Sequence, residues 1–262
     1  MKKIRKSPPP NPLNQYAANH PAETWNSGFR MHNGGADYRQ LKGIILNDQG
    51  GLCAYCETQI SAQSVEKQRI EHFHCKSDTT NPAHNWALDW NNVIGVCLGG
   101  SDTDKKVHPL PDNLSCDAYK DYLIQKQKLP KACEGYYINP LHLFATSSLF
   151  EFDKATGELK PNNSVCQSWQ IEESHYPTTQ ELVKKTIEIL NLNCQRLKDN
   201  RLEVLKRYNQ QVAKYRKAND RQGLKKLAQR WFSKPWPSYF ATRRALLGKH
   251  AEAYLNQIHY NG

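Results

Sequence analysis

A chain of 262 residues with 38% hydrophobic and 10% aromatic residues can bury a sizeable core, which excludes a wholly disordered protein. No apolar run approaches the roughly 20 residues of a membrane span. The basic start, Met1–Lys6, leads into prolines rather than an apolar segment, so we expect no signal peptide and a cytoplasmic location.

The first 50 residues contain two contrasting segments. Residues 1–36 are rich in Pro, Asn and Gly, which predicts an extended arm with little regular structure, tethered by Trp25 and Phe29. A helix is expected from Asp37 to Asn47, with Asp37 as a plausible cap. Its apolar residues follow helical spacing, namely Tyr38, Leu41, Ile44 and Ile45.

The middle of the chain predicts short strands separated by loops. Ile70–Phe73 is expected to be a strand, and Trp86–Cys97 a helix that leads into a turn. Gly99–Leu114 is polar and broken by Gly and Pro, which is typical of a loop. Leu149–Pro161 predicts a β-hairpin, with its turn at Asp153–Gly157.

The C-terminal part predicts an α-helical module. Thr178 or Thr179 caps a long helix whose apolar spacing runs to Tyr215 and fails only at Arg201. A second helix is expected around Arg221–Phe232, and a last one from about Tyr239 to Ile258.

Charge is distributed unevenly along the chain, whose net charge is +11. Residues 51–180 contain 11 basic and 16 acidic residues, whereas residues 181–262 contain 18 basic and 6 acidic residues. An acidic segment suits a metal site, and a basic one suits a polyanion or a partner. A solvated helical face rich in Lys and Arg is an equally simple interpretation of the basic segment.

Four of the eight cysteines predict a structural zinc site. Cys53 and Cys56 form a C-x2-C pair, and Cys97 and Cys116 complete the set across an 18-residue insertion. Thiolates bind zinc tetrahedrally, and a C-x2-C turn places two sulfurs on one side of a knuckle. The alternative is a redox pair, but no βαβ pattern of the thioredoxin type surrounds it. Cys194 lies on an apolar stripe and is expected in the core.

The dipeptide Glu71-His72 is the candidate catalytic site, with a candidate metal ligand beside a candidate general base. A histidine at a strand end can take a proton from water at neutral pH, and Glu71, facing the other way, can offer a hard oxygen to Mg2+. His74 competes for the same role, because strand alternation puts it on the same face as His72. His84 and His108 have no supporting context and are expected to be structural or exposed.

Together these motifs resemble the HNH, or His-Me finger, endonucleases. They are Cys-x-x-Cys, Glu-His followed by Lys-Ser, Asn-x4-Cys and Cys-Asp-x-x-Lys, spread over about 70 residues in the family's order. The resemblance implies that His72 is the general base and that Glu71 and Asp117 hold one Mg2+ or Mn2+ at the scissile phosphate. It also implies that Asn92 orients the catalytic loop and that Lys120 lies near the phosphate.

The sequence departs from the family pattern at two positions. Asp117 stands where many HNH sites have Asn or His, and it would still bind Mg2+. Cys75 stands where Pro is common, so we interpret it as a bystander thiol.

The resemblance is greatest to one branch, the PtuB-type HNH proteins of Septu and retron-associated anti-phage systems. That branch implies an ATPase partner of the PtuA type and, in its retron-associated members, a retron reverse transcriptase with its DNA–RNA element. Two alternatives remain open, namely a zinc-knuckle nucleic-acid-binding module without catalysis, and a subunit that chiefly regulates an ATPase. The chain has no phosphate-binding loop for ATP of its own.

The expected fold class is therefore α+β, with a zinc-pinned ββα-metal core and a largely α-helical C-terminal region. Residues 1–36 form the arm, 37–135 the HNH nuclease domain and 136–180 a connector that contains the hairpin. Residues 181–262 form a basic helical region for a partner or nucleic acid. The substrate is DNA or a structured RNA such as tRNA.

Overall fold

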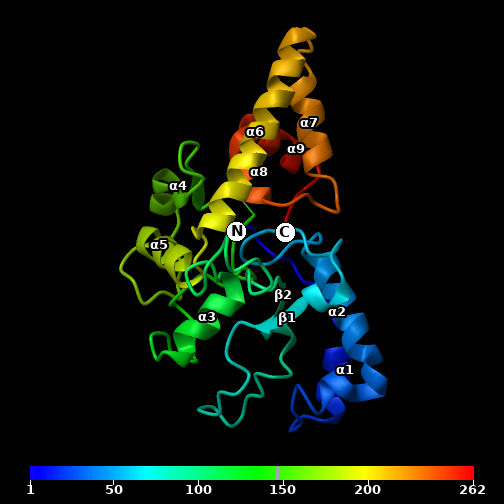
Figure 1. Ribbon diagram of the computed structural model, residues 1–262. Helices are drawn as coiled ribbons and strands as arrows, with labels where there is room; N and C mark the ends of the chain where they lie inside the picture. The colour runs from blue at the N-terminus through cyan, green and yellow to red at the C-terminus, as the bar shows by residue number, and fades with distance from the viewer. Residues whose placement is uncertain (146–147) are drawn as a thin grey trace.

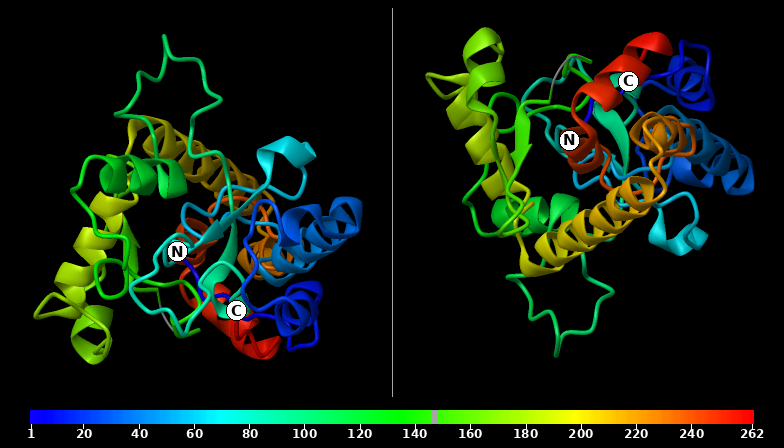
Figure 2. Two further views of the ribbon diagram at one scale, coloured as in Figure 1. Left: turned by 90° about the horizontal axis from the view of Figure 1, so that it is seen from below. Right: turned by 90° about the horizontal axis from the view of Figure 1, so that it is seen from above.

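The computed structural model describes residues 1–145 and 148–262, and the fold and contacts below refer to these. They form a mixed structure of helices with two small two-stranded sheets (Figure 1). Strands β1 and β2 lie between helices α1 and α2 on one side and α5 on the other (Figure 2). None of the described helices is long and apolar enough to span a membrane.

The N-terminal segment is more regular than its composition predicts. Helix α1, Pro12–Asn19, begins at the cap Asn11, whose side chain accepts hydrogen bonds from two backbone N–H groups. The expectation of an arm with little regular structure is therefore wrong for this part, because a proline at the first helical position favours a helix instead of breaking one. The 3-10 segment η1, Phe29–Gly35, follows.

Helix α2, Ala36–Asp48, confirms the first predicted helix. Its buried face contains Leu41 and Ile45, as their spacing predicts. Asp37 is not the cap, since Gly35 holds that position, and the Asp37 carboxylate instead bonds to His32 Nδ1 at 2.6 Å.

The central sheet pairs β1, Arg69–His72, with β2, Val93–Val96, in antiparallel register. β1 confirms the predicted strand, and the short 3-10 segment η2, Val65–Lys67, precedes it. The expected helix at Trp86–Cys97 is wrong, because this stretch holds the 3-10 turn η3, Trp90–Asn92, and then β2. All four β2 residues are buried, so the strand shows no polar alternation to reveal it.

Helix α3, Cys116–Gln125, follows the central sheet after a loop without helix or strand. Strands β3, Phe150–Phe152, and β4, Leu159–Pro161, confirm the predicted hairpin. The short helix α4, Asn163–Ser168, comes next.

The long helix expected after Thr178 is broken in two. α5, Thr179–Ile189, starts at the Thr178 cap as predicted, and α6 begins only at Gln195 and ends at Lys217. The apolar spacing continues across the break because Leu190, Leu192 and Cys194 are buried without being helical. The buried Arg201 guanidinium donates to the Leu192 carbonyl and thereby stabilises the break.

Three further helices complete the chain. α7, Gly223–Trp231, confirms the second predicted helix. The last predicted helix is wrong as a single element, because Gly248 divides it into α8, Phe240–Leu247, and α9, Lys249–Gln257. Gly248 has a φ of +49°, a backbone conformation that ends a right-handed helix.

Three hydrophobic clusters meet around the cysteine knuckle. The largest contains the four predicted zinc ligands together with side chains from Met1 to Leu246. A second joins the N-terminal helices to β2, and a third joins α7, α8 and α9 to Leu52. The knuckle is therefore held from several directions, so that its shape depends on distant parts of the chain.

Candidate active site and metal centre

The four cysteines predicted to cluster do so in the interior. Their Sγ atoms are 3.9 Å apart for Cys53 and Cys116, 3.7 Å for Cys56 and Cys97, and 3.9 Å for Cys97 and Cys116. All four are buried, and their sulfurs lie within 4.8 Å of one another. Sulfurs bound tetrahedrally at about 2.3 Å from zinc lie about 3.8 Å apart. The arrangement therefore fits a structural Zn2+.

Backbone geometry around the cysteines favours this arrangement. The Glu57 N–H donates to the Cys53 carbonyl at 3.1 Å, which closes the knuckle, and the Gly99 N–H donates to Cys97 Sγ at 3.3 Å. Gly99 has a φ of +63°, and a Cβ there would lie 2.2 Å from the Ser115 carbonyl oxygen. Only glycine therefore lets the chain after Cys97 pass close enough to the residue that precedes Cys116.

A second polar cluster joins β1 to α3. The Lys120 ammonium forms a very short contact with Glu71 Oε1 and lies 3.4 Å from Asp117 Oδ1. All three side chains are largely buried, with exposed fractions of 12% for Glu71, 8% for Asp117 and 3% for Lys120. Lys120 Nζ also donates to the backbone carbonyl of His72 at 3.2 Å, so the cluster is attached to the β1 backbone.

The carboxylate pair fits a hard divalent cation. Asp117 Oδ1 is buried and accepts no hydrogen bond, since its contact with Lys120 has ion-pair distance without hydrogen-bond geometry. Burial, followed by the nearby Asp121 carboxylate, raises the pKa of Asp117 to about 7. Burial also lowers the pKa of Lys120. Two carboxylates from a strand and a helix, one with an unbonded oxygen, are the oxygen ligands that Mg2+ prefers.

The His72 ring lies on the other face of β1, since neighbouring strand residues point to opposite sides. Its Nε2 is 3.1 Å from the Ala87 carbonyl oxygen, to which an Nε2–H donates. The Trp25 ring packs edge-on against it with centroids 4.5 Å apart. Burial lowers the pKa of His72 to about 3. The imidazole is therefore neutral at pH 7, with Nδ1 as the acceptor nitrogen.

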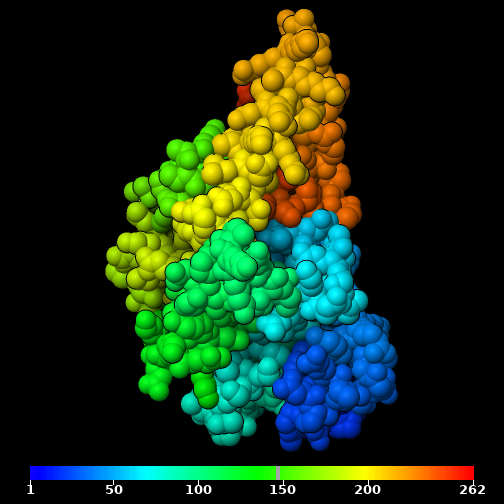
Figure 3. Space-filling model, in the orientation of Figure 1, coloured from blue at the N-terminus to red at the C-terminus, as the bar shows by residue number. Residues whose placement is uncertain are grey.

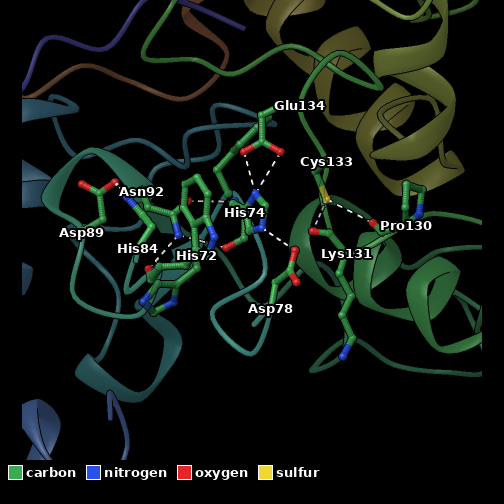
Figure 4. Close-up of polar contacts among 12 residues, drawn as sticks. His72, His74, Asp78, His84, Asp89, Asn92, Pro130, Lys131, Cys133 and Glu134 are labelled. Carbon is green, nitrogen blue, oxygen red and sulfur yellow. Dashed lines mark hydrogen bonds and ion pairs between the residues drawn. The ribbon is translucent and has the colours of Figure 1, made fainter. Parts of the chain in front are cut away.

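His74 has both ring nitrogens occupied (Figure 4). Nδ1 lies 2.8 Å from a Glu134 oxygen, Nε2 lies 2.8 Å from Asp78 Oδ2, and the ring stacks on Trp86 with centroids 3.8 Å apart. A general base needs a free nitrogen that reaches water. The geometry thus gives His74 a structural position, whereas Nδ1 of the buried His72 ring has no hydrogen-bond partner among the described residues.

Asn92 fastens the loop that contains these histidines. Its Oδ1 accepts from the His74 backbone N–H at 2.7 Å. Its Nδ2 donates to the carbonyls of His74 at 2.9 Å and Trp86 at 2.8 Å. Asn92 is 3% exposed, so these hydrogen bonds replace water that has no access.

The structure brings some predicted site residues together and separates others. Glu71, Asp117 and Lys120 form one cluster, and within the described residues no side-chain contact joins the His72 ring to it. Cys75 is only partly buried and bonds to Ser77 Oγ, away from the zinc set.

Sequence reasoning missed four residues that surround the histidines. Asp78 lies four residues after His74, a spacing that offered a weak signal. Trp25, Ala87 and Glu134 come from distant segments, and nothing local marks them. The Ala87 contribution is a backbone carbonyl, which no residue type reveals.

Comparison with known proteins gives one informative match. No protein-family model matches the sequence. The chain is 38% identical over 248 residues to a curated Escherichia coli protein named "Retron Ec83 putative HNH endonuclease". The aligned region covers 94% of this chain and 93% of that protein, so the similarity includes the helical C-terminal part as well as the cysteine-rich centre.

Proposed function

Because this chain belongs to the HNH endonuclease family of its Escherichia coli relative, we propose that it hydrolyses phosphodiester bonds of a nucleic acid in a metal-dependent reaction. The observation that carries the proposal is the convergence of Glu71 and Asp117, one of them with an unbonded oxygen, between β1 and α3. The chain order β1, β2, α3 is the order of a ββα-metal core, and we assign that core to residues 69–125.

His72 would act as the general base. The Ala87 carbonyl fixes the Nε2–H tautomer, so Nδ1 is free to accept a proton from water. The water oxygen then forms a bond to phosphorus while the bond from phosphorus to the 3′ oxygen breaks. The 3′ oxygen takes a proton from solvent water, and the imidazolium returns its own proton to solvent, which leaves 5′-phosphate and 3′-hydroxyl ends. The buried imidazole is neutral at pH 7, so Nδ1 can accept a proton, although the burial that lowers its pKa to about 3 also makes it a weak base.

Glu71 and Asp117 would hold the divalent cation, Mg2+ or Mn2+. When bound, such a cation stabilises the negative charge that develops on the leaving oxygen. Lys120 keeps the two carboxylates close together through its ammonium group and ties them to the His72 carbonyl. Asn92 would keep the loop after β1 in the position that the reaction needs.

The zinc site has a different role in this proposal. Four thiolates fill a tetrahedral coordination shell, which leaves no position for water or substrate. Hydrogen bonds from neighbouring sulfurs, that of Cys116 first, lower the pKa of Cys56, whereas burial raises the pKa of Cys116. A bound cation would favour the thiolate at all four positions. Zinc would thus hold the knuckle, β2 and α3 in place and take no part in catalysis.

The proposed retron partner is supported by the relative's name, which mentions a retron. The proposed ATPase partner of the PtuA type is supported by the resemblance of the motifs to PtuB-type proteins. We propose that the chain acts with these partners, the ATPase and a retron reverse transcriptase, in an anti-phage defence complex. The substrate class in this proposal is DNA or a structured RNA such as tRNA.

One observation favours a second candidate function. The Lys120 ammonium already pairs with Glu71 and lies near Asp117, offsetting one of the two negative charges, as it would in a purely structural ion-pair cluster. In that case the chain would be a zinc-dependent nucleic-acid-binding subunit without catalysis, or a subunit that chiefly regulates an ATPase. Loss of ATPase regulation without loss of cleavage, on deletion of residues 181–262, would support the regulatory form.

The test is to express wild type and His72→Ala with the partner and map new 5′-phosphate ends in cellular DNA and RNA. The proposal predicts new ends only with wild type, and the nucleic acid that carries them identifies the substrate. Equal ends with both proteins, or none with either while the cellular effect persists, would exclude the nuclease mechanism.

A further inference from the structure

Helices α6 and α7 form a hairpin that projects from the body of the molecule (Figures 1 and 3). Residues 206–230 contain nine basic residues and one acidic residue, Asp220, and all nine basic side chains are exposed. Lys226 pairs with Asp220 at 3.0 Å and Lys206 with Glu203 at 3.5 Å. The other seven have no carboxylate partner among the residues that the structure describes.

The two helices of the hairpin are packed tightly. Gly223, at the start of α7, lies against Tyr215 of α6, and a Cβ on this glycine would lie 2.3 Å from the tyrosine ring. Tyr208 and Trp231 pack further along the hairpin, with ring centroids 6.1 Å apart. The basic side chains therefore project from a fixed framework.

Three arginines from three helices converge where the hairpin joins the body. Arg207 on α6 lies one turn before Gln211, so the two share a helix face. Arg230 on α7 donates to Gln211 Oε1 at 3.4 Å. Arg243 on α8 stacks over Trp231, the neighbour of Arg230, with its guanidinium carbon 4.4 Å from the ring centroid.

This arginine cluster, Arg207, Arg230 and Arg243, lacks a counter-charge. No ion pair with any of the three occurs in residues 1–145 and 148–262. Arg243 is only 9% exposed, and its Nε donates to the Ser238 carbonyl at 2.8 Å. Burial, and then the charges of Arg207 and Arg230, lower the pKa of Arg243 to about 10.

Like charges gathered without a counter-charge destabilise the folded chain unless an anion neutralises them. A solvated surface does not account for Arg243, because its side chain is buried. Planar guanidinium groups bind phosphate, as they bind carboxylate, through two parallel hydrogen bonds, and the unpaired basic side chains that continue along α6 and α7 favour a polyanion such as a nucleic acid. The arginine cluster therefore has the chemistry of a phosphate site.

We propose that the arginine cluster and the α6–α7 hairpin bind the phosphate backbone of a nucleic acid. The inference rests on the proposed function, because this nucleic acid would be the one presented for cleavage. The basic residues from 206 to 217 extend over about 18 Å of helix, at about 1.5 Å per residue. Positive side chains at both ends of that length can contact phosphates several nucleotides apart on one polynucleotide.

The test measures binding by fluorescence anisotropy with three labelled probes of one sequence: a 20-nucleotide DNA strand, the same strand as RNA, and the DNA duplex. All proteins carry His72→Ala and no Mg2+ is added, so binding is read independently of cleavage. The test variant is Arg207→Gln/Arg230→Gln, whose side chains are exposed. The control is Lys154→Gln/Lys184→Gln, which removes the same charge from exposed positions elsewhere.

We expect the arginine variant to bind its best probe at least tenfold more weakly, and the control to bind within twofold of the parent. The slope of log K against log salt should fall by about 1.4 to 1.8, at 0.7 to 0.9 per phosphate contact. The melting temperature should not fall, because the substitutions relieve like-charge repulsion. Arg207→Lys/Arg230→Lys should restore part of the affinity, since lysine keeps the charge and loses the paired hydrogen bonds.

Three results would overturn the inference. In the first, the arginine variant binds all three probes with an affinity within twofold of the parent. In the second, the lysine control loses as much affinity as the arginine variant. In the third, polyglutamate displaces the probe as readily as unlabelled probe does at equal charge. The last result would indicate an acidic protein partner. Binding without any cleavage by the chain with intact His72 would instead contradict the proposed function and leave the inference standing.

Discussion

Replacing Asn92 with alanine should loosen the loop between the two central strands. The side chain makes three hydrogen bonds, to the His74 N–H and to the carbonyls of His74 and Trp86. A buried group that loses its partner costs about 1–3 kcal/mol. Because water would reach part of the opened loop, we expect a total loss of about 3 kcal/mol in the free energy of unfolding.

At about 2–4 °C per kcal/mol for a chain of this size, the melting temperature should fall by about 6–12 °C. Differential scanning calorimetry on zinc-loaded protein measures this shift, and amide exchange should quicken in residues 73–87. Asn91→Ala is the matched control, since Asn91 is exposed and only its backbone N–H is bonded. A melting temperature for Asn92→Ala within about 2 °C of wild type would refute the reasoning.

The other predictions concern zinc, the half-buried Lys6 and the His74 contacts. Chelating zinc, or Cys97→Ser, should unfold the centre of the chain, because structural zinc contributes about 10–16 kcal/mol, as much as a typical domain's whole stability. Removing Mg2+ alone should stop cleavage and leave the circular dichroism spectrum unchanged, so unfolding without Mg2+ would contradict the division into two metal sites. Burial lowers the pKa of Lys6 from 10.5 to about 7, so between these pH values the unfolded chain binds more protons and stability rises with pH. From pH 7 to 10, the free energy of unfolding of wild type should therefore rise relative to that of Lys6→Met. A difference between the two proteins that stays constant over this range would exclude a lowered Lys6 pKa. Glu134→Gln should lower the melting temperature by a few °C, about 1–2 kcal/mol, because His74 Nδ1 loses a charged partner, and no change would show that this contact contributes nothing.

Elements with a clear local pattern were predictable from the sequence. α2 shows helical spacing on its buried face, and the β3–β4 hairpin has alternating apolar residues around a polar turn. The four cysteines were identifiable because zinc ligands need particular atoms, whatever the length of the insertion between them. β2 was missed because it is buried on both faces and so lacks a polar period.

Tertiary contacts set the limit of prediction at the site. Glu71 and Asp117 were predicted from the order of the motifs. Their contacts with the same lysine, Lys120, depend on how α3 packs against β1. The break between α5 and α6 depends on the Arg201 guanidinium reaching the Leu192 carbonyl, a contact that spacing alone does not reveal. The tautomer of His72 is likewise set by the Ala87 carbonyl, fifteen residues away.

The central claim is that His72 activates water for phosphodiester cleavage, and the most direct test compares two histidine variants. Cleavage rates of purified, zinc-loaded His72→Ala and His84→Ala should be measured with Mg2+ on the nucleic acid identified in cells. His84 is the control because its ring contacts Asp89 and Trp86 but not the carboxylate pair. Loss of the general base should slow His72→Ala by about 10²–10⁴-fold, with zinc content retained and the protein folded at the assay temperature, while His84→Ala stays near wild type. Cleavage by folded His72→Ala at the wild-type rate would contradict the account.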